Sequence, residues 1–153
     1  MKVFILILVF VLELSAVSQN EVMGKWYATT QSNNNGTVTT EKEYLHLNAD
    51  RTFSMVILVS LQKGNAFVKN LRIEGSGIWK IWNNTLVAVV KKVEVPHAGE
   101  VYLISQESLR NLAKTFKNRF KNEPIRINTI QHIDKNSLIT VNEKSKETAY
   151  KRQ

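Results

Sequence analysis

The stretch GKWYATT, Gly24 to Thr30, decides how the rest of the chain is interpreted. It begins with Gly-x-Trp just after the first apolar segment, and it opens a region whose polar and apolar residues alternate mostly with period two. Such a stretch is either an ordinary first strand or the opening of a small closed barrel. The segments that follow it favour the barrel.

Turn residues interrupt the chain at short intervals after residue 23, and this spacing is typical of an antiparallel sandwich or barrel. Gly75 and Gly77 predict a bend or bulge between two strands. The chain is therefore predicted to be all-β, an antiparallel up-and-down barrel of about 8–9 strands. The predicted strands are 25–30, 43–47, 53–61, 66–74, 78–82, 85–95, 125–132, 138–141 and 147–152.

One late segment, QESLRNLAKTFKNRFK at 106–121, has helical rather than strand periodicity. Ser105 is a suitable N-cap, and Pro124 prevents continuation. We expect an amphipathic α-helix that packs as a lid over one barrel end through Leu109, Leu112, Phe116 and Phe120. Its basic flank, which is either solvated or docks on an anionic membrane surface, consists of Arg110, Lys114, Lys117 and Lys121.

The first residues have the layout of a secretory signal peptide. Lys2 is followed by the apolar run 3–12 and then by small residues, which predicts cleavage after Ser18 with Ala16 at the −3 position. The division predicted is a signal peptide at 1–18 and a single domain at 19–153. The product is expected to be exported, either periplasmic or secreted.

Composition narrows the function classes. The chain has no cysteine, which excludes disulfides, thiol catalysis and thiolate metal sites. Its formal net charge of +8 permits an anionic partner, although solubility alone also accounts for it. Nucleic acid is not expected, because export argues against it and the helix lacks exposed aromatic residues for stacking.

Gly24-Lys25-Trp26 at the start and Ala149-Tyr150-Lys151-Arg152 at the end resemble the lipocalin-like domains of exported bacterial proteins, within the calycin group of ligand-binding barrels. The resemblance covers residues 22 to 152. It implies that Gly24 and Trp26 close one end of the barrel. It also implies that a basic side chain of the last strand, Arg152 first and Lys151 second, lies across the tryptophan ring.

A ligand pocket is the best prospect for a site. The residues Phe53, Met55 and Ile57 share one face of their strand. Trp79 and Trp82 cannot both point inward, since they are three residues apart in one strand. The candidate pocket residues are Tyr44, Phe53, Met55, Ile57, Trp79 and Phe116. The alternative is an interior filled by these same side chains.

No catalytic, metal or cofactor site is expected. His46, His97 and His132 lie in different elements without ligand spacing, and Glu41 and Glu43 fit a solvated strand face. The sequence thus predicts a non-enzymatic protein that binds or carries a small hydrophobic or amphipathic ligand, as the resemblance implies. The alternative is an interaction module with a filled core, such as an inhibitor or envelope accessory protein. That module would bind an anionic or protein partner through its basic surface.

Overall fold

The computed structural model describes residues 16–153, so most of the predicted signal peptide lies outside the described residues. The strands are β1 (Gly24–Asn34), β2 (Thr37–Leu47), β3 (Thr52–Lys63), β4 (Ala66–Trp82), β5 (Thr85–Glu94), β6 (Glu100–Tyr102), β7 (Ile125–Ile133), β8 (Ser137–Asn142) and β9 (Glu147–Arg152). The helices are α1 (Gln19–Val22) and α2 (Gln106–Asn122). In this part of the chain no helix is long and apolar enough to cross a membrane.

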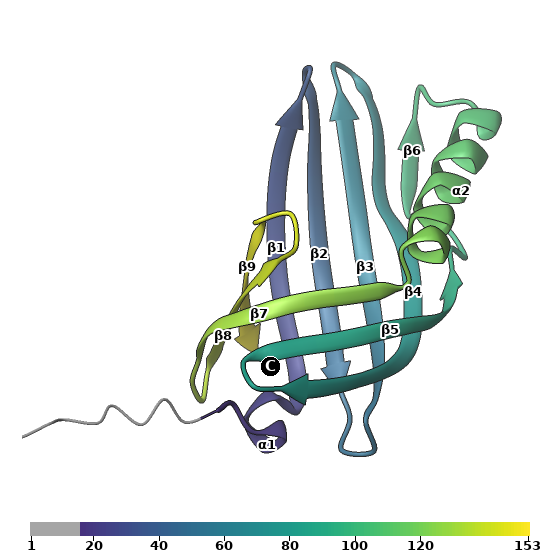
Figure 1. Ribbon diagram of the computed structural model, residues 1–153. Coiled ribbons are helices and arrows are strands. Elements are labelled where there is room, and N and C mark those ends of the chain that lie inside the picture. Colours follow the sequence, from purple (N-terminus) through teal and green to yellow (C-terminus); the bar gives the residue numbers. More distant parts are fainter. Residues whose placement is uncertain (1–15) are drawn as a thin grey trace, which may run out of the picture.

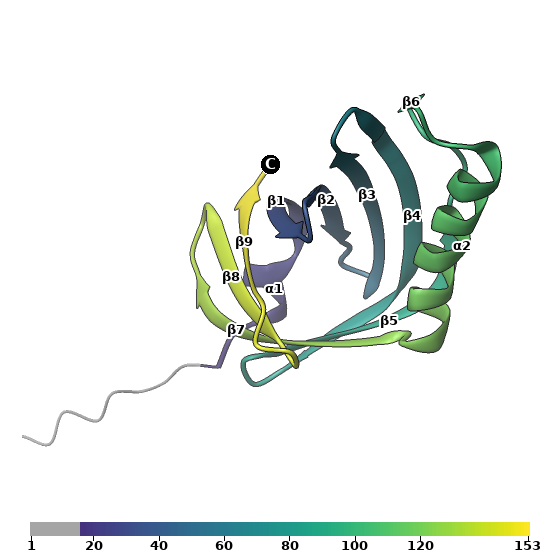
Figure 2. The ribbon, with the colours of Figure 1, turned by 90° about the horizontal axis from the view of Figure 1, so that it is seen from above.

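Eight strands of the described chain form a closed antiparallel barrel (Figures 1 and 2). Pairing follows chain order from β1 to β5, continues from β5 to β7, β8 and β9, and returns from β9 to β1. β6 lies outside this ring, because it pairs with the start of β4. The predicted all-β up-and-down barrel with a late helix is thereby confirmed.

The ring is closed by a short seam. β1 and β9 pair through Trp26 with Arg152 and through Tyr27 with Lys151. The residues of β1 beyond Tyr27, 28–34, pair with β2 alone. Figure 1 shows this upper half of the β1–β2 hairpin standing beyond β9.

Two strand predictions were wrong in their bounds. The polar segment 31–37 was predicted to be a loop, but only Asn35 and Gly36 turn, with φ of 51° and 77°. Both values are positive, as a two-residue hairpin turn requires. The segments 66–74 and 78–82 were predicted to be separate strands, but they form the single strand β4.

Glycine explains why β4 continues through its bend. The β4–β5 register shifts between Ser76 and Gly77. A Cβ at Gly77 would collide with the carbonyl oxygen of Val89, and a Cβ at Gly75 would collide with the side chain of Met55. The two glycines therefore let the strand bend closely around the side chains that fill the interior.

α2 was predicted with nearly correct bounds but at the wrong place. The Ser105 hydroxyl caps it by accepting from the Ser108 N–H at 3.1 Å. Seen from above, the helix runs along the flank of the barrel beside β4, not across its opening (Figure 2). β5 pairs with β4 only as far as Glu74, and beyond this residue the two strands separate. The apolar face of the helix packs against the core at the place where they separate.

α1 was not predicted, although its sequence carries a capping box. The Ser18 hydroxyl accepts from the Glu21 N–H, and the Glu21 carboxylate accepts from the Ser18 N–H at 2.7 Å. The helix brings Val22, which is fully buried, under the barrel. The Trp26 Nε1–H donates to the Val22 carbonyl at 2.8 Å. This short helix therefore plugs the closed end of the barrel (Figure 1).

Candidate functional site

The closed end is held by Arg152. Its guanidinium lies 4.1 Å from the centroid of the Trp26 ring, the contact that the resemblance implied. Nη1 donates to the Met23 carbonyl at 2.7 Å, Nη2 to that of Glu21 at 2.7 Å, and Nε to that of Lys135 at 2.8 Å. Through this one side chain α1, β1, β9 and the β7–β8 turn are tied together at the closed end.

Above this end lies an interior cavity in which polar and apolar side chains meet. The space in which the centre of a water molecule fits is about 30 Å³, which is room for about two waters. It is lined by Glu43, Leu45, Leu47, Phe53, Met55, Leu86, Ala88, Arg126, Asn128, Thr140 and Tyr150.

Three of the five polar residues that line the cavity form a cluster: Glu43, Arg126 and Tyr150. The buried Tyr150 hydroxyl donates to the Glu43 carboxylate at 3.2 Å. Burial, and next the negative charge of Glu43, raise the pKa of Tyr150 well above its usual range, and the positive charge of Arg126 opposes this rise. The tyrosine therefore stays a neutral donor through the physiological pH range, and Glu43 is its acceptor.

Arg126 projects into the same interior from β7. Its Nη1 lies 3.9 Å from the Met55 sulfur, and its guanidinium lies 5.6 Å from the centroid of the Phe120 ring. None of the ion pairs formed among residues 16–153 includes Arg126. A guanidinium so placed is well suited to pair with the carboxylate or phosphate of a ligand.

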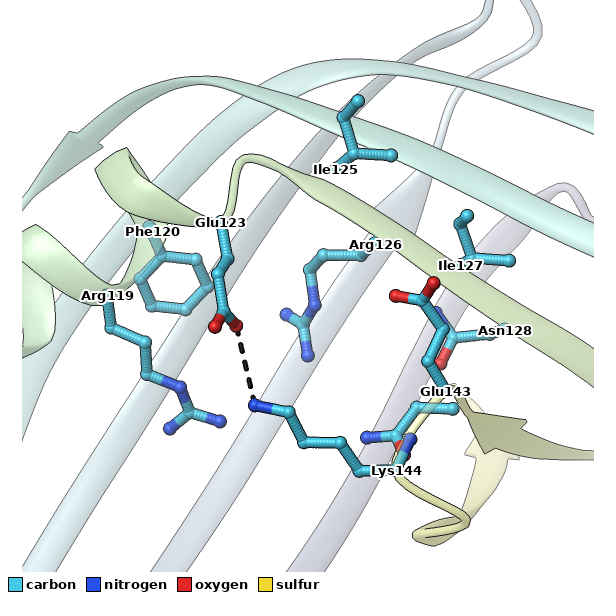
Figure 3. Close-up of a pocket in the computed structure, with 10 residues that line it drawn as sticks. Arg119, Phe120, Glu123, Ile125, Arg126, Ile127, Asn128, Glu143 and Lys144 are labelled. Atoms are coloured by element: carbon cyan, nitrogen blue, oxygen red, sulfur yellow. Dashed lines mark hydrogen bonds and ion pairs between the residues drawn. The ribbon is translucent and has the colours of Figure 1, made fainter.

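A second pocket opens at the barrel mouth and shares Arg126 and Asn128 with the cavity (Figure 3). It offers about 90 Å³ by the same measure. Figure 3 shows Arg126 and Lys144 extending from opposite sides toward the space below β7. Lys144 pairs with Glu123 at 3.5 Å, which joins the end of α2 to the β8–β9 turn. The remaining lining residues are Arg119, Phe120, Ile125, Ile127, Asn142 and Glu143.

The candidate pocket residues from the sequence fall in several places. Phe53 and Met55 line the cavity, and Ile57 is buried higher on the same face of β3. Trp79 is buried and donates to the Asn48 carbonyl at 3.1 Å, whereas Trp82 is 68% exposed.

The two remaining candidates lie apart from the cavity. Phe116 is partly buried where α2 packs on the barrel. Tyr44 is placed by strand alternation on the outer face of the barrel, where its ring lies 5.0 Å from that of Tyr27. The structure therefore brings Phe53 and Met55 to the cavity and leaves Tyr44 outside it.

Glu43, Arg126 and Tyr150 were missed as site residues. Glu43 was assigned to a solvated strand face, but it shares its face of β2 with Leu45 and the buried Leu47. Strand parity with these apolar neighbours could have placed it inside. Its register partner on β1 is Ala28. This small residue lies between Glu43 on β2 and the strand β9, which carries Tyr150.

The three histidines lie in different elements. His97 is exposed, and His46 is half-buried on β2. The His132 Nε2 lies 2.8 Å from the exposed Asp134 carboxylate. Within the described residues, no group of three potential metal ligands comes together.

No protein-family model matches this chain, and no curated protein matches it.

Proposed function

We propose that this protein is a lipocalin-like, non-enzymatic binding protein that takes a small amphipathic molecule at its barrel mouth. The observation that carries the proposal is Arg126, a guanidinium inside a closed barrel with no carboxylate paired to it among residues 16–153. An acidic group of the ligand would supply that partner. Export is proposed from residues 1–18 alone.

Each of the two neighbouring pockets binds a different part of the ligand. The cavity of about 30 Å³ holds a small acidic group beside Arg126 but no alkyl chain. The apolar part of the ligand therefore lies at the mouth, where Phe120 and the stem of Arg126 supply apolar surface. This geometry favours a short or compact amphiphile over a long lipid held deep in the barrel.

The proposal is binding without chemistry. Among the residues that line the cavity, Glu43 is the one carboxylate, and its oxygen already accepts from Tyr150. General acid–base catalysis of hydrolysis at a site of this kind uses paired groups of shifted pKa within reach of a substrate. The cavity lining instead offers a fixed donor, a fixed acceptor and a cation, which is a set suited to recognition.

The alternative function is an interaction module with a filled core. It is favoured by one observation, the small size of the interior cavity. In that case the basic surface binds an anionic or protein partner, and its affinity falls steeply with salt.

A ligand titration separates the two. Medium-chain fatty acids and the matching alcohols are offered to the purified protein, and bound ligand is measured by native mass spectrometry and calorimetry. We expect the acid to bind at least ten-fold more tightly than the alcohol, and Arg126→Ala to abolish this preference. Arg110→Ala, an exposed arginine of α2, is the matched control and leaves it unchanged. Equal binding of acid and alcohol, or no binding of either, would overturn the proposal and favour the interaction module.

A further inference from the structure

An apolar group lies beside β6, which we call the β6 patch and which consists of the half-buried Phe67 and the exposed Tyr102 and Leu103. Tyr102 is 53% exposed and Leu103 is 69% exposed. The rings of Phe67 and Tyr102 stack with centroids 5.6 Å apart, and the Lys69 Nζ lies 4.6 Å from the Phe67 centroid. Because β6 lies outside the ring of the barrel, these side chains stand on a projecting part of the chain (Figures 1 and 2).

The exposure of Leu103 is fixed by its backbone. Its φ is +54°, a left-handed conformation that is uncommon for a residue with a bulky side chain. The neighbouring Val101 and Ile104 pack against the core, and Ser105 then caps α2. The chain thus holds Leu103 outward at a conformational cost, which persists only because the surrounding structure determines it.

A stripe of cations lies next to this patch. We call it the α2 stripe: Arg110, Lys114, Lys117 and Lys121, all exposed. At 3.6 residues per turn they fall within an arc of about 60° on the helix. The ion pairs formed within residues 16–153 include none of the four. Figures 1 and 2 show β6 and α2 side by side on the same flank of the barrel.

Little negative charge opposes this flank. The Glu100 carboxylate of β6 pairs with Lys69 at 3.2 Å. Glu107 lies in the first turn of α2, where it favours the helix dipole. The flank therefore combines apolar side chains with a net positive charge.

We propose that the β6 patch and the α2 stripe together dock this protein on an anionic lipid bilayer. Tyrosine and leucine enter the interfacial layer of the bilayer, and the lysine and arginine side chains are attracted to its anionic surface. A projection of this kind fits a deformable lipid surface, whereas a groove would fit a protein segment. The α2 residues Arg119 and Phe120 also line the mouth pocket, so docking places that pocket near the lipid.

Docking on a bilayer gives the amphipathic ligand a source, and in this respect it rests on the proposed function. Docking itself is tested on the protein without any ligand. Binding is measured by cosedimentation with vesicles of phosphatidylcholine, alone or with 30% phosphatidylglycerol as an added component. We expect binding to the anionic vesicles only, and a loss of binding as salt is raised. Arg126→Ala, which abolishes ligand preference, leaves vesicle binding unchanged, so failure of one proposal is distinguishable from failure of the other.

Two matched pairs of variants locate the surface. Leu103→Gly removes the apolar side chain and suits the positive φ, so it does not unfold the protein, and we expect at least five-fold weaker vesicle binding. Trp82→Ser removes an equally exposed apolar residue (68%) at the other end of β4, near α1, and leaves binding unchanged. The fourfold change of the α2 stripe to Gln weakens binding at least ten-fold.

The charge control changes Lys25, Lys42, Lys80 and Lys151 to Gln, which alters net charge by the same amount at exposed sites elsewhere. Equal loss of binding in the two fourfold variants would overturn the proposal, since attraction would then be unspecific. So would equal loss in Leu103→Gly and Trp82→Ser, or undiminished binding in Leu103→Gly.

Discussion

Gly24 gives Arg152 the space in which its guanidinium lies. A Cβ at Gly24 would stand 2.7 Å from Nη1 of Arg152, and Gly24 itself has a φ of +123°, which a residue with a side chain rarely adopts. The glycine at the start of β1 and the arginine at the end of β9 therefore form one structural unit with the Trp26 ring, over which the guanidinium lies.

Replacing Arg152 should open the closed end. Arg152→Ala removes three hydrogen bonds to carbonyl oxygens and the contact with Trp26, for an expected loss of about 2–4 kcal/mol of unfolding free energy. Arg152→Lys should recover only a minor part, since an ammonium cannot reach the three carbonyls in one plane. Urea unfolding measures both. The neighbouring exposed Lys151→Ala is the control and should cost less than about 0.5 kcal/mol.

Gly24→Ala should be more destabilising than alanine at another glycine of positive φ. Gly64 has a φ of +57° and no atom near its would-be Cβ, so Gly64→Ala carries backbone strain alone, about 1–2 kcal/mol. Gly24→Ala adds displacement of Arg152, and we expect about 3–5 kcal/mol. A double-mutant cycle measured by urea unfolding checks the cause. In the Arg152→Ala background the cost of Gly24→Ala should fall, and an unchanged cost would show that the two residues are not coupled.

Local signals in the sequence were sufficient for most strands of the barrel and for the late helix. The strand periodicity and the helix with its cap at Ser105 come from short patterns at fixed positions, whereas the Trp26–Arg152 contact was implied by the resemblance found at the two ends of the chain. The interior cluster was not predictable in the same way. Glu43 and Tyr150 are 107 residues apart, and only the register of three strands brings them together. Cavity size likewise depends on how side chains from many strands interdigitate, which periodicity does not specify.

Alkaline pH should reveal the buried position of Tyr150. Burial and the charge of Glu43 raise its pKa in the folded state above its value in the unfolded chain. The unfolded chain therefore binds fewer protons above about pH 10, and the stability that Tyr150 contributes is present below that pH and lost above it. Absorbance of tyrosinate should show a late phase at high pH that belongs to Tyr150. In Tyr150→Phe this late phase should be missing; its persistence would contradict the assignment.

Acid should destabilise the folded protein by protonating Asp134, whose carboxylate accepts hydrogen bonds within the β7–β8 turn. The hydrogen bond with His132, and next the bonds from the Asn136 and Ser137 N–H groups and the Ser137 hydroxyl, lower the pKa of Asp134 well below its usual range. Its contribution to stability is present above about pH 4 and is lost as the pH falls further.

The variant Asp134→Asn should lower the urea midpoint at pH 7 and flatten its decline between pH 4 and pH 2. Glu143→Gln, which removes a different carboxylate that directly follows β8, serves as the control. A variant whose acid dependence equals that of the wild type would show that the turn does not depend on this carboxylate.

The short seam between β1 and β9 also sets an order of events in time. The Met23 carbonyl and Arg152 are 129 residues apart, so closing the ring is among the costliest loop closures in this chain, whereas the hairpins form locally. We expect closure after the rate-limiting barrier to folding. A contact made late changes the rate of unfolding and not that of folding. Stopped-flow kinetics of Arg152→Lys should accordingly show faster unfolding and a nearly unchanged refolding rate. This single arginine therefore slows the opening of the folded barrel and takes little part in its assembly.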